Sequence, residues 1–235
     1  MRLQLDAGNT RIKWRVYDQA KVVAAGSDLR QTLEDKPEWY LSLKEVWVSS
    51  VHTEQDTWIK SIFPMAFFAQ SQVNCAGLSN SYEDVHKMGV DRWLAMLAVW
   101  QRQPDQTHIV IDAGTAITLD IIDGFGRHVG GYICPGFNLM KGSLLNGTKK
   151  VWAEDEWQLG RAPGNRTQLC VDHGIQDMVA CWLERHCTLQ PDAKITLTGG
   201  DGPRLSALLT KKISYQADLV LDGLAVYFQY KKADK

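Results

Sequence analysis

Residues 3–18 read LQLDAGNTRIKWRVYD and residues 109–123 read IVIDAGTAITLDIID, so one pattern occurs twice in this chain. In each stretch a short apolar run ends in Asp-Ala-Gly, a threonine follows closely, and a second apolar run begins. Between Ile12 and Val16 every second residue is apolar, which is the period of a β-strand. A strand, a tight glycine turn and another strand predict a β-hairpin, so we expect Asp6 and Asp112 at two hairpin tips.

Two hairpins separated by about half of the chain indicate two related halves. Residues 90–102 (VDRWLAMLAVWQR) have apolar residues at helical spacing, and Pro104 follows them as a helix breaker. The sequence therefore predicts a first domain of residues 1–105 and a second domain of residues 106–235. Strands are predicted at 45–51 and 194–198, and a long helix at 167–185. Because strands and helices alternate in both halves, the predicted fold class is α/β.

The composition is that of a globular cytosolic protein. Of the 235 residues, 45% are hydrophobic, and 26 basic residues nearly balance 27 acidic ones, so no bulk positive charge favours nucleic acid or an anionic membrane surface. The five cysteines show neither a C-x-x-C pair nor zinc-finger spacing, which predicts reduced thiols. No apolar run is long enough to cross a bilayer, so we expect a soluble, cytoplasmic protein.

A carboxylate beside a glycine turn suits the binding of phosphate through a metal ion. The glycine lets backbone N–H groups approach an anion closely, and the carboxylate can hold Mg²⁺ or its waters. Lys13, one step along the second strand, could neutralise phosphate charge. A single D-x-G-x-T is common in hairpin turns, but two matched copies favour nucleotide binding. The strand that runs into Gly199-Gly200 adds a third place where backbone can approach a nucleotide.

Four segments together resemble the type III pantothenate kinases, within the superfamily of actin, sugar kinases and chaperone ATPases. They are Asp6–Lys13 (DAGNTRIK), Gly89–Arg92 (GVDR), Asp112–Thr118 (DAGTAIT) and Gly130–Gly136 (GGYICPG). The resemblance runs from residue 1 to about residue 225. It implies two ribonuclease-H-like halves with mixed sheets flanked by helices, an actin-like ATPase fold, and a homodimer. The implied reaction is transfer of a phosphoryl group from ATP to the terminal hydroxyl of pantothenate, the first step toward coenzyme A.

The resemblance also implies roles for particular residues. Asp91 matches the catalytic base, and Asp112 matches a ligand of the monovalent cation, K⁺ or NH₄⁺, that the family requires besides Mg²⁺. Thr167 falls where the family has a substrate-contacting threonine, although the preceding residue there is commonly Asn and is Arg166 here. ATP would be bound by Asp6, Ala7, Gly8, Asn9, Thr10, Arg11, Ile12, Lys13 and Thr115. Pantothenate would be bound by Tyr82, Gly89, Val90, Asp91, Arg92 and Thr167.

The chemistry of phosphoryl transfer agrees with these roles. The reaction needs charge neutralisation, in-line positioning and a base near the acceptor hydroxyl, and a metal-bound carboxylate is a poor proton acceptor. Asp91 is separate from both hairpin tips and begins a predicted helix, where the helix dipole favours a carboxylate. The same position also suits an ordinary helix-start residue, with Arg92 as a solvated side chain. Arg92 could instead hold the carboxylate of pantothenate in a bidentate manner.

Other functions remain open from the sequence alone. A kinase of the same fold could act on another small hydroxylated acceptor, because fold does not fix the acceptor. A non-catalytic, nucleotide-binding regulatory module is the alternative from a different class. The presence of all three carboxylates, Asp6, Asp91 and Asp112, favours an enzyme.

Overall fold

The chain forms two compact units. The computed structural model describes residues 1–9, 11–35, 37–211 and 213–233. The first unit consists of Met1–Pro104, Gly126–His128 and the chain from Asp218 onward, and the second of Asp105–Phe125 and Val129–Ala217. This division departs from the contiguous halves 1–105 and 106–235 predicted above, because the last helix packs within the first unit and not the second.

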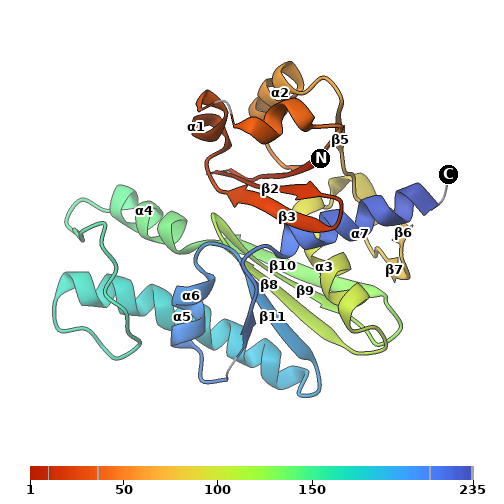
Figure 1. Ribbon diagram of the computed structural model, residues 1–235. Helices are drawn as coiled ribbons and strands as arrows, with labels where there is room; N and C mark the ends of the chain where they lie inside the picture. Colours follow the sequence, from red (N-terminus) through yellow and green to blue (C-terminus); the bar gives the residue numbers. More distant parts are fainter. Residues whose placement is uncertain (10, 36, 212, 234–235) are drawn as a thin grey trace. The chain divides into compact units, whose positions relative to one another are not determined.

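The first unit is built on a mixed sheet in the order β3-β2-β1-β4-β5, with β1 antiparallel to β2 and parallel to β4. Figure 1 labels most of its elements. In chain order they are β1 (Arg2–Ala7), β2 (Ile12–Asp18), β3 (Lys21–Gly26), α1 (Leu29–Glu34), η1 (Glu38–Ser42), β4 (Glu45–Ser50), α2 (Thr53–Ile62), β5 (Ala66–Phe68), β6 (Asn74–Cys75), β7 (Leu78–Ser79), η2 (Val85–Lys87), α3 (Val90–Arg102) and α7 (Leu219–Ala233).

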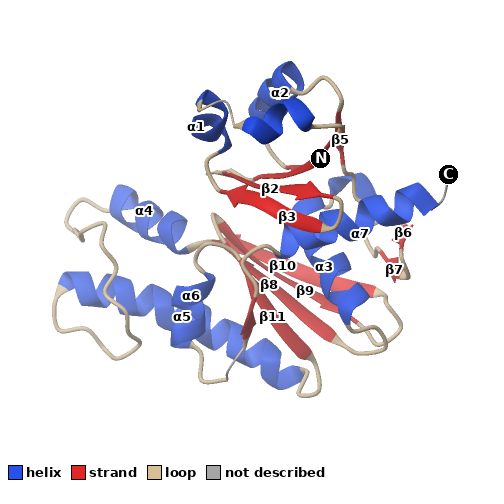
Figure 2. Ribbon diagram, viewed as in Figure 1, coloured by secondary structure: helices blue, strands red, loops and turns tan. Residues whose placement is uncertain are grey.

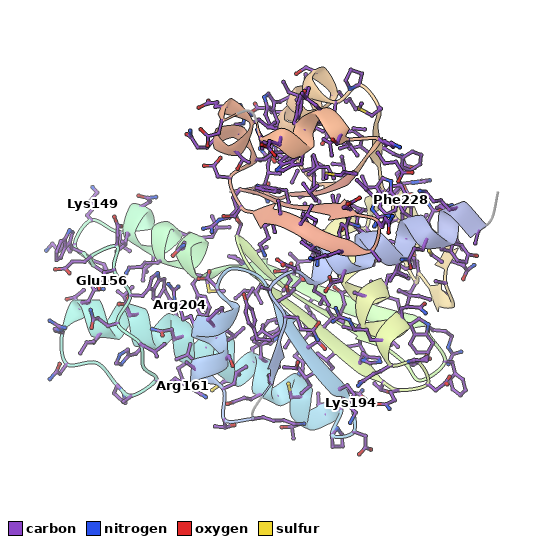
Figure 3. All side chains as sticks on the ribbon, viewed as in Figure 1. Lys149, Glu156, Arg161, Lys194, Arg204 and Phe228 are labelled. Atoms are coloured by element: carbon purple, nitrogen blue, oxygen red, sulfur yellow. The ribbon has the colours of Figure 1, made fainter. Side chains whose placement is uncertain are left out.

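Helices cover both faces of this sheet, as Figure 2 shows. On one face Leu29 of α1 and Ile59 of α2 join Leu3 and Leu5 in a buried core. On the other face the rings of Trp47 on β4 and Phe228 on α7 stack with centroids 4.2 Å apart. Phe228 is labelled in Figure 3. Alternate residues of a strand face opposite sides of the sheet, and both sides are buried here. This burial fixes the pairing register of β1 and β2, and so determines which residues lie at the tip of their hairpin.

The second unit repeats the plan with a sheet in the order β10-β9-β8-β11-β12. Strand β8 is antiparallel to β9 and parallel to β11. Apolar residues of the sheet, among them Ile111 and Leu197, share a core with Phe137, Ile175 and Leu205 of the helices. The elements are β8 (His108–Ala113), β9 (Ala116–Ile122), β10 (His128–Pro135), α4 (Phe137–Gly147), α5 (Thr167–Leu189), β11 (Lys194–Thr198), α6 (Gly202–Leu208) and β12 (Ser214–Tyr215).

The structure confirms the α/β class with two mixed sheets flanked by helices. Both predicted hairpins form, β1–β2 and β8–β9. The predicted helix at 90–102 and strand at 194–198 have the observed bounds. Helix α5 begins at Thr167 as predicted but continues to Leu189, past the predicted end at 185, because His186 and Cys187 continue its buried face.

Candidate active site

The tip of the β1–β2 hairpin places an acidic and a basic side chain side by side. Asp6 on β1 and Lys13 on β2 are direct partners in the antiparallel register, so their side chains project from the same face of the sheet. Gly8 has room around it, since among the described residues a Cβ added there would meet only the carbonyl oxygen of Arg11, at 3.7 Å. From α2, Gln55 Nε2 donates a hydrogen bond to the Gly8 carbonyl oxygen at 2.8 Å.

The other residues predicted at this tip divide by exposure. Asn9 and Arg11 are exposed, whereas the side chains of Ala7 and Ile12 belong to the core of the first unit. Ala7 and Ile12 can therefore serve a nucleotide only through their backbone. Thr10, predicted to contact ATP, lies outside the described residues. The tip thus offers room around Gly8 next to one carboxylate and one ammonium group.

The β8–β9 tip is held tightly by two glycines from other segments. Its turn closes with a hydrogen bond from Gly114 N to the Ala116 carbonyl oxygen at 3.0 Å. Gly136 N donates to the Thr115 carbonyl oxygen at 2.9 Å, and a Cβ at 136 would lie 2.1 Å from the Gly114 oxygen. Gly199 has a φ of 92°, and a Cβ there would lie 2.4 Å from Asp112 Oδ1. Only glycine fits either position, which explains two of the glycine motifs in the sequence.

This arrangement leaves Asp112 partly exposed next to the backbone of Gly199, and Thr115 exposed. Asp201 lies two residues after Gly199, and its backbone N donates to the Ala113 carbonyl oxygen at 2.8 Å. Burial raises the pKa of the Asp201 carboxyl group, which is paired with Arg204 of α6 at 3.2 Å. Arg204 is labelled in Figure 3. The second tip therefore carries carboxylates and close-approaching backbone, the groups that phosphate–metal binding needs.

Asp91 is the second residue of α3, and Gly89, which precedes the helix, caps it with no side chain of its own. Asp91 Oδ1 accepts a hydrogen bond from Arg92 N at 2.8 Å. A Cβ at residue 89 would lie 2.5 Å from the same oxygen, so the carboxylate can fold back over the helix start only because residue 89 is glycine. The helix dipole stabilises the ionised form here.

Arg92 is buried, with 6% of its surface exposed, and is not the solvated side chain that the ordinary helix-start interpretation implies. Its Nη1 atom donates to the hydroxyl oxygen of Tyr82 at 2.7 Å, and its Cζ atom lies 5.7 Å from the centre of that ring. The structure therefore brings together Tyr82, Asp91 and Arg92, three residues predicted to contact the acceptor. Val90, another predicted contact, has its side chain in the interior.

A cavity of about 360 Å³ adjoins this segment within the first unit. Gly89 and Val90 form part of its wall, and the exposed His86 and Lys87 give it basic groups. The remaining walls are Met88, the end of β4 and the segment after β5, the last two contributing Ser50, Val51, Ala69, Gln70 and Ser71. A pocket of this size holds a small molecule rather than a macromolecule.

Thr167 and the β8–β9 tip belong to the second unit, whereas Asp6–Lys13, Tyr82 and Asp91 belong to the first. Thr167 is the exposed first residue of α5, and Arg166 before it makes no capping hydrogen bond with its side chain. The sequence interpretation gave no role to His128, which lies in the first unit and contacts Tyr82. Its position two residues before Gly130-Gly131 was the only signal that could have drawn attention to it.

Within the described ranges, no three His, Cys, Asp or Glu side chains gather in an arrangement that could hold a metal ion. One carboxylate at a tip nonetheless suits Mg²⁺, which keeps several waters and binds largely through substrate phosphates. Of the helices that the structure describes, none has both the length and the apolar character needed to cross a membrane.

Comparison with known proteins places the chain among relatives of similar length. Residues 2–188 match the family model of the type III pantothenate kinases. The chain is 35% identical over 238 residues to the type III pantothenate kinase of Marinobacter nauticus, with 95% of this chain and 96% of that protein covered. It is also 35% identical over 246 residues to that of Pseudomonas aeruginosa, with 96% and 98% covered.

Solved structures show the same fold at low sequence identity. A protein described as a Baf family transcriptional activator from Campylobacter jejuni superposes with a TM-score of 0.68 at 20% identity, covering 98% of this chain and 99% of that one. A protein described as a 2-dehydro-3-deoxygalactonokinase from Sinorhizobium meliloti gives a TM-score of 0.62 at 11% identity, covering 97% and 98%. These likenesses bear on the fold alone.

Proposed function

The chain belongs to the type III pantothenate kinase family, and from this premise we propose that Asp91 is the general base with which it phosphorylates pantothenate. The enzyme transfers the terminal phosphoryl group of ATP to the primary hydroxyl of pantothenate and so begins coenzyme A synthesis. The observation that carries the proposal is the grouping of Asp91, Arg92 and Tyr82 at the start of α3, next to Gly89 and Val90, which form part of the cavity wall. Asp91 accepts the hydroxyl proton as the oxygen attacks the phosphorus atom.

The two hairpin tips supply the nucleotide side of the reaction. At the first tip the segment Asp6–Lys13 contacts the phosphates, with Lys13 neutralising charge. At the second tip Asp112 holds a monovalent cation and Thr115 contacts ATP. Asp112 fits this role because its carboxylate is partly exposed and lies against closely packed backbone, which offers oxygen ligands. Mg²⁺, when bound with ATP, neutralises charge on the transferring phosphoryl group.

The acceptor occupies the cavity next to Gly89, with its hydroxyl toward Asp91. Arg92 is buried and already donates to Tyr82, so the two side chains act on the acceptor as a pair. Lys87 places positive charge at the same cavity and suits the carboxylate of pantothenate, to which His86 can donate a hydrogen bond. Thr167 keeps the substrate-contacting role that the family resemblance implies. We further propose that the enzyme is a cytoplasmic homodimer.

The test is ATP-dependent phosphorylation of pantothenate by the purified protein, followed with Mg²⁺ and with or without K⁺. We expect turnover that depends on K⁺. Asp91→Asn should lower kcat by roughly 100- to 10,000-fold, because a general base typically contributes that much. ATP binding, measured by calorimetry, and the unfolding midpoint should stay near wild type, because the amide can still accept from Arg92 N.

Asp192→Asn serves as the charge-matched control, because Asp192 is exposed in the turn between α5 and β11. It should leave kcat unchanged. Near-wild-type turnover in Asp91→Asn would refute the base assignment. Nucleotide binding by the wild-type protein without turnover of pantothenate would instead favour another acceptor or a regulatory module.

A further inference from the structure

His128 is a buried histidine, with 2% of its surface exposed, that the proposed reaction does not use. It reaches the first unit through the short segment Gly126–His128, which runs beside residues 79–81. Ser79 N donates to the Gly126 carbonyl oxygen at 2.8 Å, and Ser79 pairs with Arg127 in a parallel bridge. This close approach requires glycine at residue 126, because a Cβ there would lie 2.3 Å from the Gly77 carbonyl oxygen.

The segment Gly126–His128 places the ring of His128 against the ring of Tyr82. The two ring centroids are 6.1 Å apart with their planes inclined by 27°, an offset stacked arrangement. His128 Nδ1 lies 3.0 Å from Ser81 Oγ, within hydrogen-bond distance, which fixes the orientation of the imidazole. Tyr82 N in turn donates to Asn80 Oδ1 at 3.0 Å. Both the backbone and the ring of Tyr82 are therefore held by neighbouring groups.

The far end of Tyr82 is the hydroxyl that accepts from Arg92 Nη1 at 2.7 Å. A continuous set of contacts thus runs from Ser81 through His128 and Tyr82 to Arg92, the neighbour of the proposed base. Packing and hydrogen bonds from neighbouring residues restrict a side chain to few rotamers. This support determines how precisely a binding group is oriented.

We propose that His128 is a positioning residue for the acceptor site: oriented by Ser81, it holds the Tyr82 ring and thereby the guanidinium of Arg92. The inference rests on the proposed function, which assigns Tyr82 and Arg92 to pantothenate. His128 itself touches no reacting atom, so its loss affects acceptor binding more than the chemical step.

The experiment compares Ser81→Ala and His128→Phe with wild type, measuring KM for pantothenate, KM for ATP, kcat and the urea midpoint. Losing this partly buried hydrogen bond should raise KM for pantothenate by roughly 2- to 12-fold in Ser81→Ala. His128→Phe keeps a ring against Tyr82 but loses the Nδ1 contact, so we expect a similar rise. KM for ATP should stay within about twofold of wild type in both variants.

A double-mutant cycle with Tyr82→Phe separates positioning from general loss of packing. Tyr82→Phe removes the hydroxyl that accepts from Arg92, so adding Ser81→Ala should raise KM for pantothenate little further. His186→Phe is the matched control, a buried histidine of the second unit that contacts the rings of Tyr132 and Trp182. It should lower the urea midpoint without changing KM for pantothenate. Unchanged KM in Ser81→Ala and His128→Phe, or an additive cycle, overturns the proposal.

A readout without substrate keeps this proposal distinct from the proposed function. In ¹⁵N-labelled protein the Arg92 side-chain N–H resonances, assigned with Arg92→Lys, should shift in Ser81→Ala and in His128→Phe. Resonances that stay in place overturn the positioning role even if pantothenate is phosphorylated. Absence of wild-type turnover with pantothenate counts against the proposed function alone, because the resonance shifts still test whether His128 orients Arg92.

Discussion

Single glycines decide the geometry around Asp112. Gly199 has a φ of 92°, and a Cβ there would lie 2.3 Å from the Ala113 carbonyl oxygen, whereas a Cβ on Gly200 would meet nothing within 4 Å. The obstacle at residue 199 is backbone, which cannot move aside as a flexible side chain can. Residue 199 must therefore be glycine, whereas residue 200 has room for a side chain.

We predict that Gly199→Ala lowers the free energy of unfolding by roughly 2–4 kcal/mol, the combined cost of a left-handed alanine and of overpacking. Gly200→Ala should change it by no more than about 0.5 kcal/mol. Urea unfolding of both variants checks this. Because the added methyl group displaces Asp112, Gly199→Ala should also raise the K⁺ concentration for half-maximal activity. Equal stability of the two variants would contradict the prediction.

The sequence could place some site residues accurately and others not. The alternation after Gly8 predicted that Lys13 follows the tip of Asp6 along the second strand, and the two are partners in register. The burial of Arg92 could not be predicted, because it depends on the fold of the polar segment 71–89, which brings Tyr82 to the start of α3. Contacts between segments without a periodic pattern leave no local signal in the sequence.

At the scale of elements, a buried ion pair joins α4 to α5. Lys141 Nζ and Asp172 Oδ1 are 2.9 Å apart, and their side chains are 6% and 0% exposed. Asp172 Oδ2 also accepts from Gln168 Nε2 at 2.7 Å and from Gln158 N at 2.8 Å, so the pair also fixes the connection between the two helices. Since Thr167 precedes Gln168, this network supports the start of α5.

Removing one partner of this pair should cost far more than removing an exposed one. We expect Lys141→Met to lower the free energy of unfolding by about 3–5 kcal/mol, because Asp172 keeps a buried charge without its counter-ion. Lys141→Met with Asp172→Asn should recover most of that loss. Lys232→Met, which breaks the exposed contact with Glu45, is the control and should cost less than about 1 kcal/mol. Urea unfolding at pH 7 measures all three, and equal losses in the two lysine variants would refute this account.

Elements with strong periodicity were predictable, and the connection between α4 and α5 was not. The connection contains Arg161, labelled in Figure 3, which ties it to α5. Its Nε lies 2.9 Å from Asp177 Oδ1 and its Nη1 lies 2.9 Å from Glu184 Oε1. The hydrogen bond from Arg161 lowers the pKa of Glu184 to about 2. A lone arginine in a polar stretch gives no sign of such partners.

At the scale of the whole chain, the C-terminal helix completes the N-terminal unit. Asp222 of α7 pairs with Arg15 of β2 at 2.7 Å and with Arg102 of α3 at 2.5 Å. The prediction of two contiguous halves did not include this packing of the C-terminal helix in the first unit. A boundary inferred from composition and helix-breaking residues cannot detect a helix that packs against a distant part of the chain. Gly223, the next residue, packs against the backbone of Leu94 on α3.

Alanine substitutions at two helix glycines test the packing of α7 against α3. A Cβ on Gly223 would lie 1.8 Å from the Leu94 carbonyl oxygen, so Gly223→Ala must push α7 away from α3 and should cost at least about 3 kcal/mol of unfolding free energy. Gly174, inside α5, has open space around it, and Gly174→Ala should raise the stability by about 0.5–1 kcal/mol. Urea unfolding with tryptophan fluorescence measures both. Because α3 carries Asp91 and Arg92, Gly223→Ala should also lower turnover, whereas Gly174→Ala should not. Similar stabilities for the two variants would show that α7 is not held on α3 as closely as this contact requires.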